Sequence, residues 1–464
     1  MLALGYRYLW IDRYCIEQTD CPARHLQIQQ MGNTYSSASV TIIAAAGSNP
    51  HHGLPGVSQT PRITQPSEMI LGSLVIGFPD APRASIQNSV WNTRAWTYQE
   101  ALLSRRRLIF SEQQVYFECQ KSCREECYVD NRVDLFAMGD PIFHEQRFGL
   151  RPEEIFRYIS IYSKKSLTFD TDYLNAFLGI LRALGKQQHP VEHISGVPIF
   201  PPVIYNFRNG TLKKANRSCS ERFMVGMTWA VSSGRRRSAM FPSWSWAGWA
   251  GEVGWTRHHY NEENVLYSPG PYCRLLNLNS SCQVWTEETN GELVPLEHSQ
   301  NDQRRFEIFK IIHVESTTFP LTLAHDHMRR NIYRPDSADE FHPRYLPRGD
   351  CITWNIEGGM TVYCPVVLFE EPLKDPVKEI IMQQRELKAL LIGTWAGHQH
   401  NETADHWEAK LLRRLEDGYE VVGHISFSQF DLHFELDQDT RLALENVTRE
   451  SLMPKCTRER VRLL

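Results

Sequence analysis

The order of apolar and polar positions predicts an α/β arrangement in the first fifty residues. Residues 7–12 (RYLWID) form an apolar run that predicts a buried strand. Residues 39–47 (SVTIIAAAG) are β-branched and nearly all apolar, which is typical of an interior strand of a parallel sheet. Between them, residues 23–38 predict a helix with one apolar face. The apolar positions of that face follow at steps of three, four and three and are Ile28, Met31, Tyr35 and Ala38. Together these elements predict a βαβ unit with a right-handed crossover.

Two further elements follow in the pattern. Residues 92–104 (NTRAWTYQEALLS) predict a helix, with Asn92 or Thr93 as its N-cap. Residues 107–119 (RLIFSEQQVYFEC) predict a hairpin whose turn is SEQQ. Gly32 lies inside the predicted helix 23–38 and costs it about 1 kcal/mol relative to alanine, so something other than helix propensity must favour glycine there.

The middle of the chain predicts helices, and the C-terminal part predicts strands. A first helix starts near Pro152, and its apolar positions are spaced i, i+3, i+4 and i+7. A second helix is expected at about 171–184, with Gly185 as its C′ residue. Residues 241–251 (FPSWSWAGWAG) place three tryptophans among small residues, and short strands and loops follow beyond about 252. Asp417-Gly418 predicts a hairpin turn.

Length, composition and charge narrow the class of protein. The chain has 464 residues, which predicts two or three domains. Its net charge of −4 gives no indication of a nucleic-acid or membrane-surface partner, and the short run Arg105-Arg106-Arg107 is interpreted as a solvated face. Eleven scattered cysteines predict reduced thiols. No signal peptide and no apolar stretch of 18 residues is found, so we expect a soluble cytoplasmic protein without a membrane span.

The cysteines do not predict a reactive or metal site. Cys119, Cys123 and Cys127 recur at steps of four, and His144 could complete a zinc site, but structural zinc usually uses closer pairs separated by a longer loop. We therefore expect free thiols and no metal. Cys15 is interpreted as a small buried side chain at a strand end rather than as a nucleophile.

Asp12 and Glu100 are the candidate reactive groups. Asp12 ends the predicted strand 7–12, where open α/β sheets bind ligands, but it could equally cap the following turn. Trp96 and Glu100 are four residues apart and share one helix face. A carboxylate beside an indole suits an oxocarbenium-like sugar with a flat leaving group. The residues alone favour a simpler interpretation, in which Trp96 packs inward and Glu100 pairs with Arg94 or Arg105.

Several stretches together resemble the HET (heterokaryon incompatibility) domain of filamentous fungi. They are YRYLWIDRYCIEQ, MGNTYSSA, VTIIAAAG, GLPG at 53–56, RAWTYQEALLSRRRLIF and VYFEC. LTFDTDYLNAFLGI at 167–180 and FPSWSWAGWAG at 241–251 are similar to segments that follow this domain in many such proteins. The resemblance covers residues 1–250, and the order and spacing of its motifs are specific.

The resemblance implies a function in non-self recognition when hyphae fuse, ending in programmed cell death. HET domains are regarded as distant relatives of the TIR domain, a flavodoxin-like α/β fold. Some TIR domains cleave NAD with a helix-borne glutamate that follows a tryptophan by four residues. This implies an NAD glycohydrolase in which Glu100 is catalytic. Asp12, Trp96 and Arg94 would bind NAD, which is the substrate, and no cofactor is implied.

The chain also departs from the family pattern. HET domains begin with a strand similar to ALSYxWG and a helix, and neither precedes residues 7–12 here. We therefore expect a HET domain over residues 1–130 that lacks its front edge, a helical region over 131–250 and a β-rich region over 251–464. A module that signals by self-association or with an unknown protein partner, without catalysis, and an inactive remnant are the alternatives.

Overall fold

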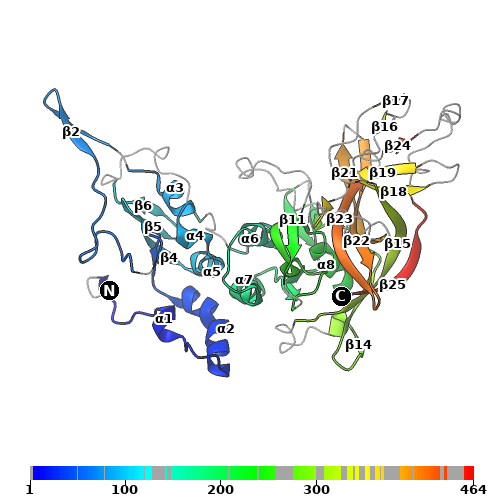
Figure 1. Cartoon of the computed structure of the whole chain (residues 1–464), viewed down its shortest axis with the longest axis horizontal. Coiled ribbons are helices and arrows are strands. Elements are labelled where there is room, and N and C mark those ends of the chain that lie inside the picture. Colours follow the sequence, from blue (N-terminus) through cyan, green and yellow to red (C-terminus); the bar gives the residue numbers. More distant parts are fainter. Residues whose placement is uncertain are drawn as a thin grey trace. The chain divides into compact units, whose positions relative to one another are not determined.

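In the computed structural model, the chain forms two compact units. Unit 1 comprises Met1–Leu150 and Lys164–Gln188, and unit 2 comprises Arg151–Ser163 and His189–Leu464 (Figure 1). The domain ranges predicted from the sequence, 1–130, 131–250 and 251–464, remain predictions. The structure describes residues 4–49, 51–77, 79–119, 121–127, 142–143, 148–206, 209–237, 240–255, 275–298, 308–324, 332–337, 340–343, 351–355, 361–365, 367–369, 387–399, 402–428, 433–435 and 454–464.

Unit 1 contains a small mixed sheet in the order β1-β4-β5-β6. Its strands are β1 (Thr41–Ala44), β4 (Arg106–Phe110), β5 (Val115–Cys119) and β6 (Cys123–Glu125). Only the β1–β4 pair is parallel, and β4–β5 and β5–β6 are antiparallel. The predicted hairpin is therefore confirmed as β4–β5. The expected α/β character is present as a mixed sheet with helices, but β1 is an edge strand among the described residues, so its predicted interior position is wrong.

Three helices of unit 1 meet at glycines. They are α2 (Pro22–Ser37), α5 (Ala95–Leu103) and α7 (Asn175–Leu184). A Cβ on Gly32 of α2 would lie 2.8 Å from the Cα of Gly179 in α7, and a Cβ on Gly179 would collide with the Gln99 side chain of α5. The helix 23–38 is confirmed, and close packing against α7 explains why glycine is favoured at position 32.

The predicted strand over residues 7–12 does not form. Residues 6–11 are not part of any strand, Tyr8 is 84% exposed, and Asp12–Cys15 form the short helix α1. A strand needs a neighbour to accept its backbone hydrogen bonds, and no described strand lies beside this segment. Cys15 is accordingly exposed rather than buried.

The predicted N-cap of helix 92–104 is also wrong. Ser89 caps the short helix α4 (Val90–Thr93) by accepting a hydrogen bond from the Asn92 amide, and α5 starts only at Ala95. The helix α3 (Pro82–Gln87) precedes α4. The chain bends at Arg94, which has an extended backbone conformation between α4 and α5.

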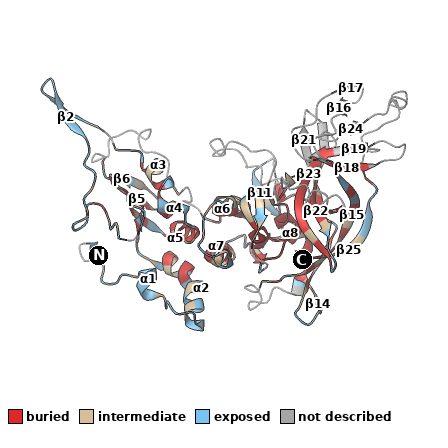
Figure 2. Ribbon diagram, in the orientation of Figure 1, coloured by how far each residue is buried: buried red, intermediate tan, exposed pale blue. Residues whose placement is uncertain are grey.

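A second hairpin of unit 1 projects from the rest of that unit. Its strands are β2 (Ser67–Ile70) and β3 (Ser73–Ile76), and every one of their residues is exposed (Figures 1 and 2). The sequence pattern gave no indication of this hairpin.

The two predicted central helices form. In α6 (Glu154–Ser163) of unit 2, the four expected apolar positions are fully buried: Ile155, Tyr158, Ile159 and Tyr162. In unit 1, a 3₁₀ turn (η2, Asp170–Asp172) precedes α7, which begins four residues later than expected. Gly185 follows α7 as predicted, but its φ of −65° makes no use of the left-handed conformation.

Unit 2 is β-rich, and the described residues beyond 251 are β-rich as predicted. Strands also occur from residue 192 onward, however, within the range 131–250 that was expected to be helical. A large sheet of the described strands has the order β17-β16-β24-β19-β18-β15-β21-β22-β23-β20, with β13, β14 and β25 attached. Besides α6, the unit contains the helix α8 (Cys219–Gly226) and the 3₁₀ turns η3 (Trp246–Gly248) and η5 (Leu296–His298). Its strands are β7 (Glu192–Ile194), β8 (Val197–Ile199), β9 (Val203–Asn206), β10 (Thr211–Lys214), β11 (Ala230–Arg236), β12 (Trp249–Gly254), β13 (Gln283–Glu287), β14 (Leu293–Pro295), β15 (Ile312–Ala324), β16 (Ile332–Ser337), β17 (Glu340–Pro343), β18 (Cys351–Asn355), β19 (Thr361–Pro365), β20 (Val367–Leu368), β21 (Leu387–Gln399), β22 (Glu402–Arg414), β23 (Tyr419–Ser428), β24 (His433–Glu435) and β25 (Thr457–Leu463).

Two sequence signals of unit 2 have clear structural meanings. The tryptophans of FPSWSWAGWAG, which are Trp244, Trp246 and Trp249, are fully buried. Asp417-Gly418 lies in the turn between β22 and β23, as predicted. Within the described part of the chain, no helix combines the length and the apolar composition that a membrane crossing needs.

Candidate functional site

Glu100 lies on the less buried side of α5. Seven of the nine residues of this helix are buried in unit 1, while Trp96 and Glu100 are half-buried. The i, i+4 spacing places these two side chains on one face, as predicted. The end of the helix is fixed to the sheet, because the Ser104 hydroxyl donates to the Glu100 carbonyl at 2.6 Å and lies 2.6 Å from the Thr41 hydroxyl of β1.

The environment of Glu100 disfavours its charge. The pKa of the Glu100 carboxyl is raised to about 8, mainly by burial and also by the negative charge of Asp12. The Trp91 indole and the Arg94 guanidinium act in the opposite direction and lower this pKa. The Trp91 N–H makes no hydrogen bond of regular geometry, so its effect on Glu100 comes from its proximity rather than from an ideal bond.

Tyr35 belongs to the same group of residues. Burial raises the pKa of the Tyr35 phenol far above its usual value, and the charges of Glu100 and Asp12 raise it further, while Arg94 lowers it. Asp12, Tyr35, Trp91, Arg94 and Glu100 are therefore close enough to interact electrostatically, and we call them the Glu100 cluster. They come from α1, α2, α4, the α4–α5 bend and α5.

The cluster combines exposed and buried side chains. Asp12 and Arg94 are exposed, whereas Tyr35 and Trp91 are buried. Trp10 packs its ring edge-on against Tyr35, with 5.8 Å between the ring centroids. The extended segment before α1, which forms no strand, therefore brings Asp12 to the cluster through this aromatic contact.

A strap over residues 164–168 holds the bend at Arg94. The Ala95 amide donates to the Ser166 carbonyl at 2.9 Å, and the Ser166 amide donates to the Thr93 carbonyl at 2.8 Å. The Lys165 ammonium donates to the backbone and side-chain oxygens of Asn92 at 2.6 and 2.8 Å. Burial lowers the pKa of Lys165 to about 8. These bonds fix where α5 begins and thereby hold the backbone of Arg94 in its extended conformation.

The structure brings together three of the four predicted site residues. Asp12, Arg94 and Glu100 interact within the cluster, and Trp96 shares the helix face of Glu100. Sequence reasoning missed Tyr35, which was interpreted only as part of the apolar stripe of its helix. It also missed Trp91, which precedes the predicted helix by one residue.

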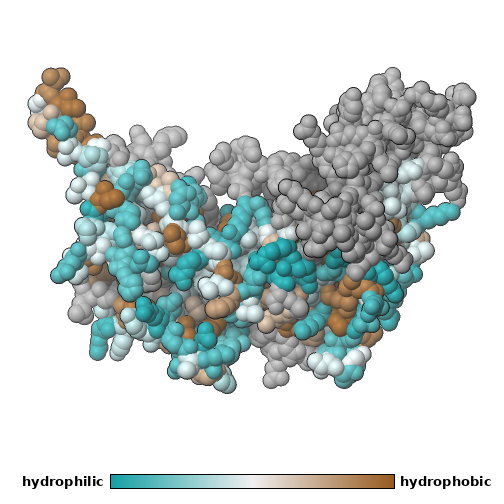
Figure 3. All heavy atoms as spheres, in the orientation of Figure 1, coloured by the Kyte–Doolittle hydropathy of each residue, from teal (hydrophilic) through white to brown (hydrophobic). Residues whose placement is uncertain are grey.

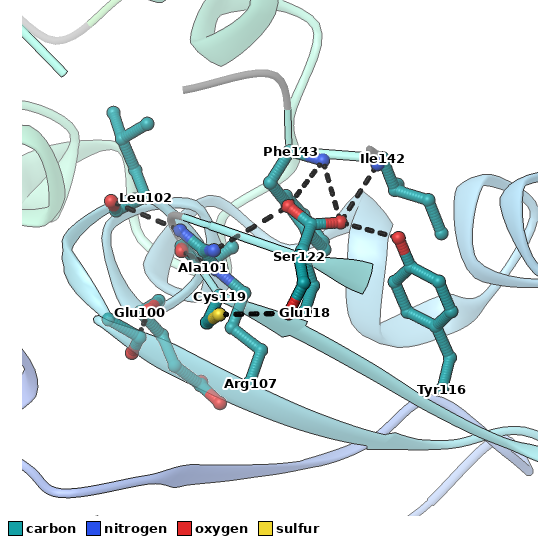
Figure 4. Close-up of polar contacts among 11 residues, drawn as sticks. Glu100, Ala101, Leu102, Arg107, Tyr116, Glu118, Cys119, Ser122, Ile142 and Phe143 are labelled. Carbon is teal, nitrogen blue, oxygen red and sulfur yellow. Dashed lines mark hydrogen bonds and ion pairs between the residues drawn. The ribbon is translucent and has the colours of Figure 1, made fainter. Parts of the chain in front are cut away.

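A second group of charged residues in unit 1 is structural. Arg107 and Glu118 are both buried, with 3.6 Å between Arg107 Nη1 and Glu118 Oε1 (Figure 4). Arg107 also donates to the carbonyls of Ala101 and Leu102 at the end of α5. The interpretation of Arg105-Arg106-Arg107 as a solvated face is thus wrong for Arg107, because β4 turns this side chain into the core.

Glu118 links this ion pair to a distant segment. Its carboxylate accepts hydrogen bonds from the Tyr116 hydroxyl at 2.7 Å and from the amides of Ile142 and Phe143 at 2.8 and 3.1 Å (Figure 4). Burial raises the pKa of Glu118, and the hydrogen bond from Tyr116 and the charge of Arg107 oppose this. With these partners the carboxylate holds residues 142–143 against the sheet, which is a structural role.

The cysteines form no metal site among the described residues. Cys119, Cys123 and Cys127 are reduced thiols, and no group of three metal-binding side chains is present in the part of the chain that the structure describes. His144 lies outside the described residues.

One comparison with known proteins gives the family of the N-terminal part. Residues 1–100 match the family model described as heterokaryon incompatibility protein (HET). The chain carries a HET domain. The match ends at Glu100, so all five residues of the Glu100 cluster lie within it. No curated protein and no solved structure matches the chain.

Proposed function

We propose that the HET domain cleaves NAD between nicotinamide and ribose, as the step that causes programmed cell death in a fungal incompatibility response. The proposal rests on one observation in particular: a half-buried carboxyl, Glu100, lies among two exposed charged groups and two buried aromatic side chains. Strongly shifted carboxyl groups in partly open sites are typical of catalytic positions. The distant relationship to NAD-cleaving TIR domains that the sequence resemblance implies also favours it.

The chemistry needs the charged form of Glu100. The bond between ribose C1′ and the nicotinamide nitrogen breaks, and its electron pair stays with the nitrogen, so nicotinamide leaves as a neutral molecule without needing an acid. C1′ becomes an oxocarbenium-like cation, to which water adds with release of a proton. An ionised Glu100 facing C1′ stabilises this cation.

The raised pKa suits such a role. Without substrate, a carboxyl with a pKa near 8 is mostly protonated at neutral pH, so it lies in its site without a charge that needs solvation. The positively charged nicotinamide ring of NAD favours the ionised carboxylate. Substrate binding therefore deprotonates Glu100 where the cation will develop.

The other predicted site residues bind NAD in this proposal. Arg94 is exposed at the start of α5 and provides a guanidinium for the NAD diphosphate. Trp96 provides a flat surface for the nicotinamide ring. Asp12 hydrogen-bonds ribose hydroxyls, and its charge helps to keep the pKa of Glu100 high.

The test is nicotinamide release by the purified full chain. Glu100→Gln keeps the shape of the side chain but cannot become negative, so we expect it to lower the turnover by about a hundredfold or more. Glu125→Gln is the matched control, because Glu125 is another half-buried carboxyl of unit 1 whose pKa is raised by burial. Equal turnover by the folded Glu100→Gln protein and the wild type would exclude the proposed role.

A non-catalytic module that acts by self-association is the second candidate function. The observation that favours it is the exposed apolar hairpin β2–β3 of the HET-containing unit. Folded wild-type protein that assembles but releases no nicotinamide would support this candidate over NAD cleavage.

A further inference from the structure

The hairpin β2–β3 carries an exposed apolar surface. Each of its residues from Ser67 to Ile76 is exposed, and Figure 3 shows an apolar group of atoms at the end of this projection. The apolar side chains are Met69, Ile70, Leu71, Leu74, Val75 and Ile76. Among the described residues of its unit, no third strand pairs with this hairpin, and two strands alone are only marginally stable in water.

The hairpin tip has an unusual backbone. Leu71 and Gly72 have φ angles of 51° and 79°, which is the pattern of a two-residue type I′ turn. Asparagine or glycine is preferred at the first of these positions, and a branched leucine is strained there. Leu71 is nevertheless fully exposed and touches nothing that would explain its presence. Its position is better suited to an intermolecular contact.

The chemistry of the hairpin favours a sheet edge over a lipid surface. Glu68 is the only charged residue between Ser67 and Ile76, so no basic side chain attracts anionic lipids. The outer edges of two strands also carry backbone amides and carbonyls, which hydrocarbon cannot satisfy. Another sheet edge can satisfy them by adding the hairpin as further strands.

Unit 1 itself offers such an edge. β1 is the edge of its sheet and pairs with β4 alone among the described strands. Like β2 and β3, it has four residues. The exposed guanidinium of Arg106 donates to the Ser39 carbonyl just before β1. A hairpin strand running parallel to β1 would bring the negative charge of Glu68 to this positive end.

We propose that the hairpin of one copy adds to the β1 edge of a second copy, with β2 parallel to β1, in a reciprocal dimer. Six apolar side chains that are half to fully exposed bury roughly 400 Å² per hairpin. Two hairpins and the two surfaces they cover then give about 1,600 Å², which is the size of a standard stable interface. One hairpin contact alone falls below this size, so the dimer needs both. The proposal does not depend on the chemistry of Glu100.

The first test measures the oligomeric state by sedimentation equilibrium. We expect the wild-type chain to form dimers, and Met69→Lys with Ile70→Lys to weaken the dimer roughly a hundredfold, because two charges would become buried without partners. Leu26→Lys is the control, since Leu26 is a similarly exposed apolar residue on α2, and it should leave the dimer unchanged. A monomeric wild type, or a dimer that survives the hairpin changes, would overturn the proposal.

A second test locates the contact itself. In the parallel register Ile70 lies beside Ala44 of the other copy, and both residues are exposed. Mixing Ile70→Cys protein with Ala44→Cys protein under mild oxidation should give a disulfide-linked pair of these peptides by mass spectrometry. A dimer without this link, or binding of the wild type to neutral lipid vesicles that the hairpin changes abolish, would show that the hairpin has another partner. Because neither test measures NAD turnover, its outcome is separate from that of the proposed activity.

Discussion

Replacing Glu100 by glutamine should stabilise unit 1, and increasingly so as the pH rises. Burial raises the pKa of the folded carboxyl from its ordinary value of 4.5 to about 8. The unfolded chain therefore releases this proton at a lower pH than the folded chain. Between these two values the folded state binds more protons than the unfolded state, so its stability falls as the pH rises and then levels off above about pH 8. Glutamine has no proton to lose, so the variant lacks this decline.

The size of the effect follows from the two pKa values. A difference of one in pKa corresponds to about 1.36 kcal/mol, so the upper limit for the stability lost by the wild type is about 3 kcal/mol at pH 7. Glu100 is only half-buried, and solvent screens part of this interaction. We therefore expect Glu100→Gln to stabilise unit 1 by about 1–2 kcal/mol at pH 7 and by almost nothing near pH 4.5.

The measurement must report on unit 1 alone. Because the chain has two compact units, a single unfolding transition does not define one free energy. Amide hydrogen exchange of the peptides from α5 and β4 reports local opening within unit 1. The wild type, Glu100→Gln and the control Glu125→Gln should be compared between about pH 4.5 and pH 8, after correction for the intrinsic exchange rate.

A pH-independent difference between Glu100→Gln and the wild type would refute the reasoning. Slower opening of the variant at every pH would mean that glutamine packs better, rather than that it removes a costly charge. If the variant becomes less stable relative to the wild type as the pH rises, the folded protein favours the carboxylate form of Glu100. The control should show a smaller dependence on pH, because its local hydrogen bond from Cys127 opposes the effect of burial on its pKa.

Three further predictions test the account at other points. If ionised Glu100 is required, kcat/KM for NAD should rise with pH to a plateau above about pH 8, as a pH–rate profile would show; a fall in activity over this range contradicts the role. Gly32→Ala should destabilise unit 1 by about 1–3 kcal/mol despite the better helix propensity of alanine, because its Cβ would collide with Gly179; exchange in α2 measures this, and unchanged protection contradicts the packing argument. Glu118→Gln should cost about 3–5 kcal/mol, because Arg107 would be left buried without its counter-charge. Amide exchange in β4 and β5 measures this loss, and a value below about 1 kcal/mol would mean that solvent reaches the pair.

The sequence predicts local elements better than their partners. Helix α2 and the hairpin β4–β5 follow from periodicity and turn residues, which depend only on neighbours along the chain. Residues 7–12 have the apolar pattern of a strand, but they form none because no described strand lies beside them. The edge position of β1 was likewise missed, since its apolar composition is the same in the interior of a sheet and at its edge.

The candidate site shows the same limit. The spacing of Trp96 and Glu100 gives their shared face, and the family resemblance gives Arg94. Asp12 was a candidate because it ends the predicted strand 7–12, and that strand does not form. Tyr35 and Trp91 join the cluster through tertiary packing, which no local pattern encodes. The burial of Arg107 was missed for a related reason. Three consecutive arginines look alike in sequence, and the side chains of β4 alternate between its two faces, so only the packing of β4 shows which arginine faces the core.

The measurement that tests the central claim most directly is the release of nicotinamide from NAD by the purified chain at about pH 8, where Glu100 is half ionised. The account predicts turnover by the wild type and by Glu125→Gln, with loss of turnover in Glu100→Gln while amide exchange shows that unit 1 remains folded. Turnover that persists in Glu100→Gln, or its absence in a folded wild type, would contradict it.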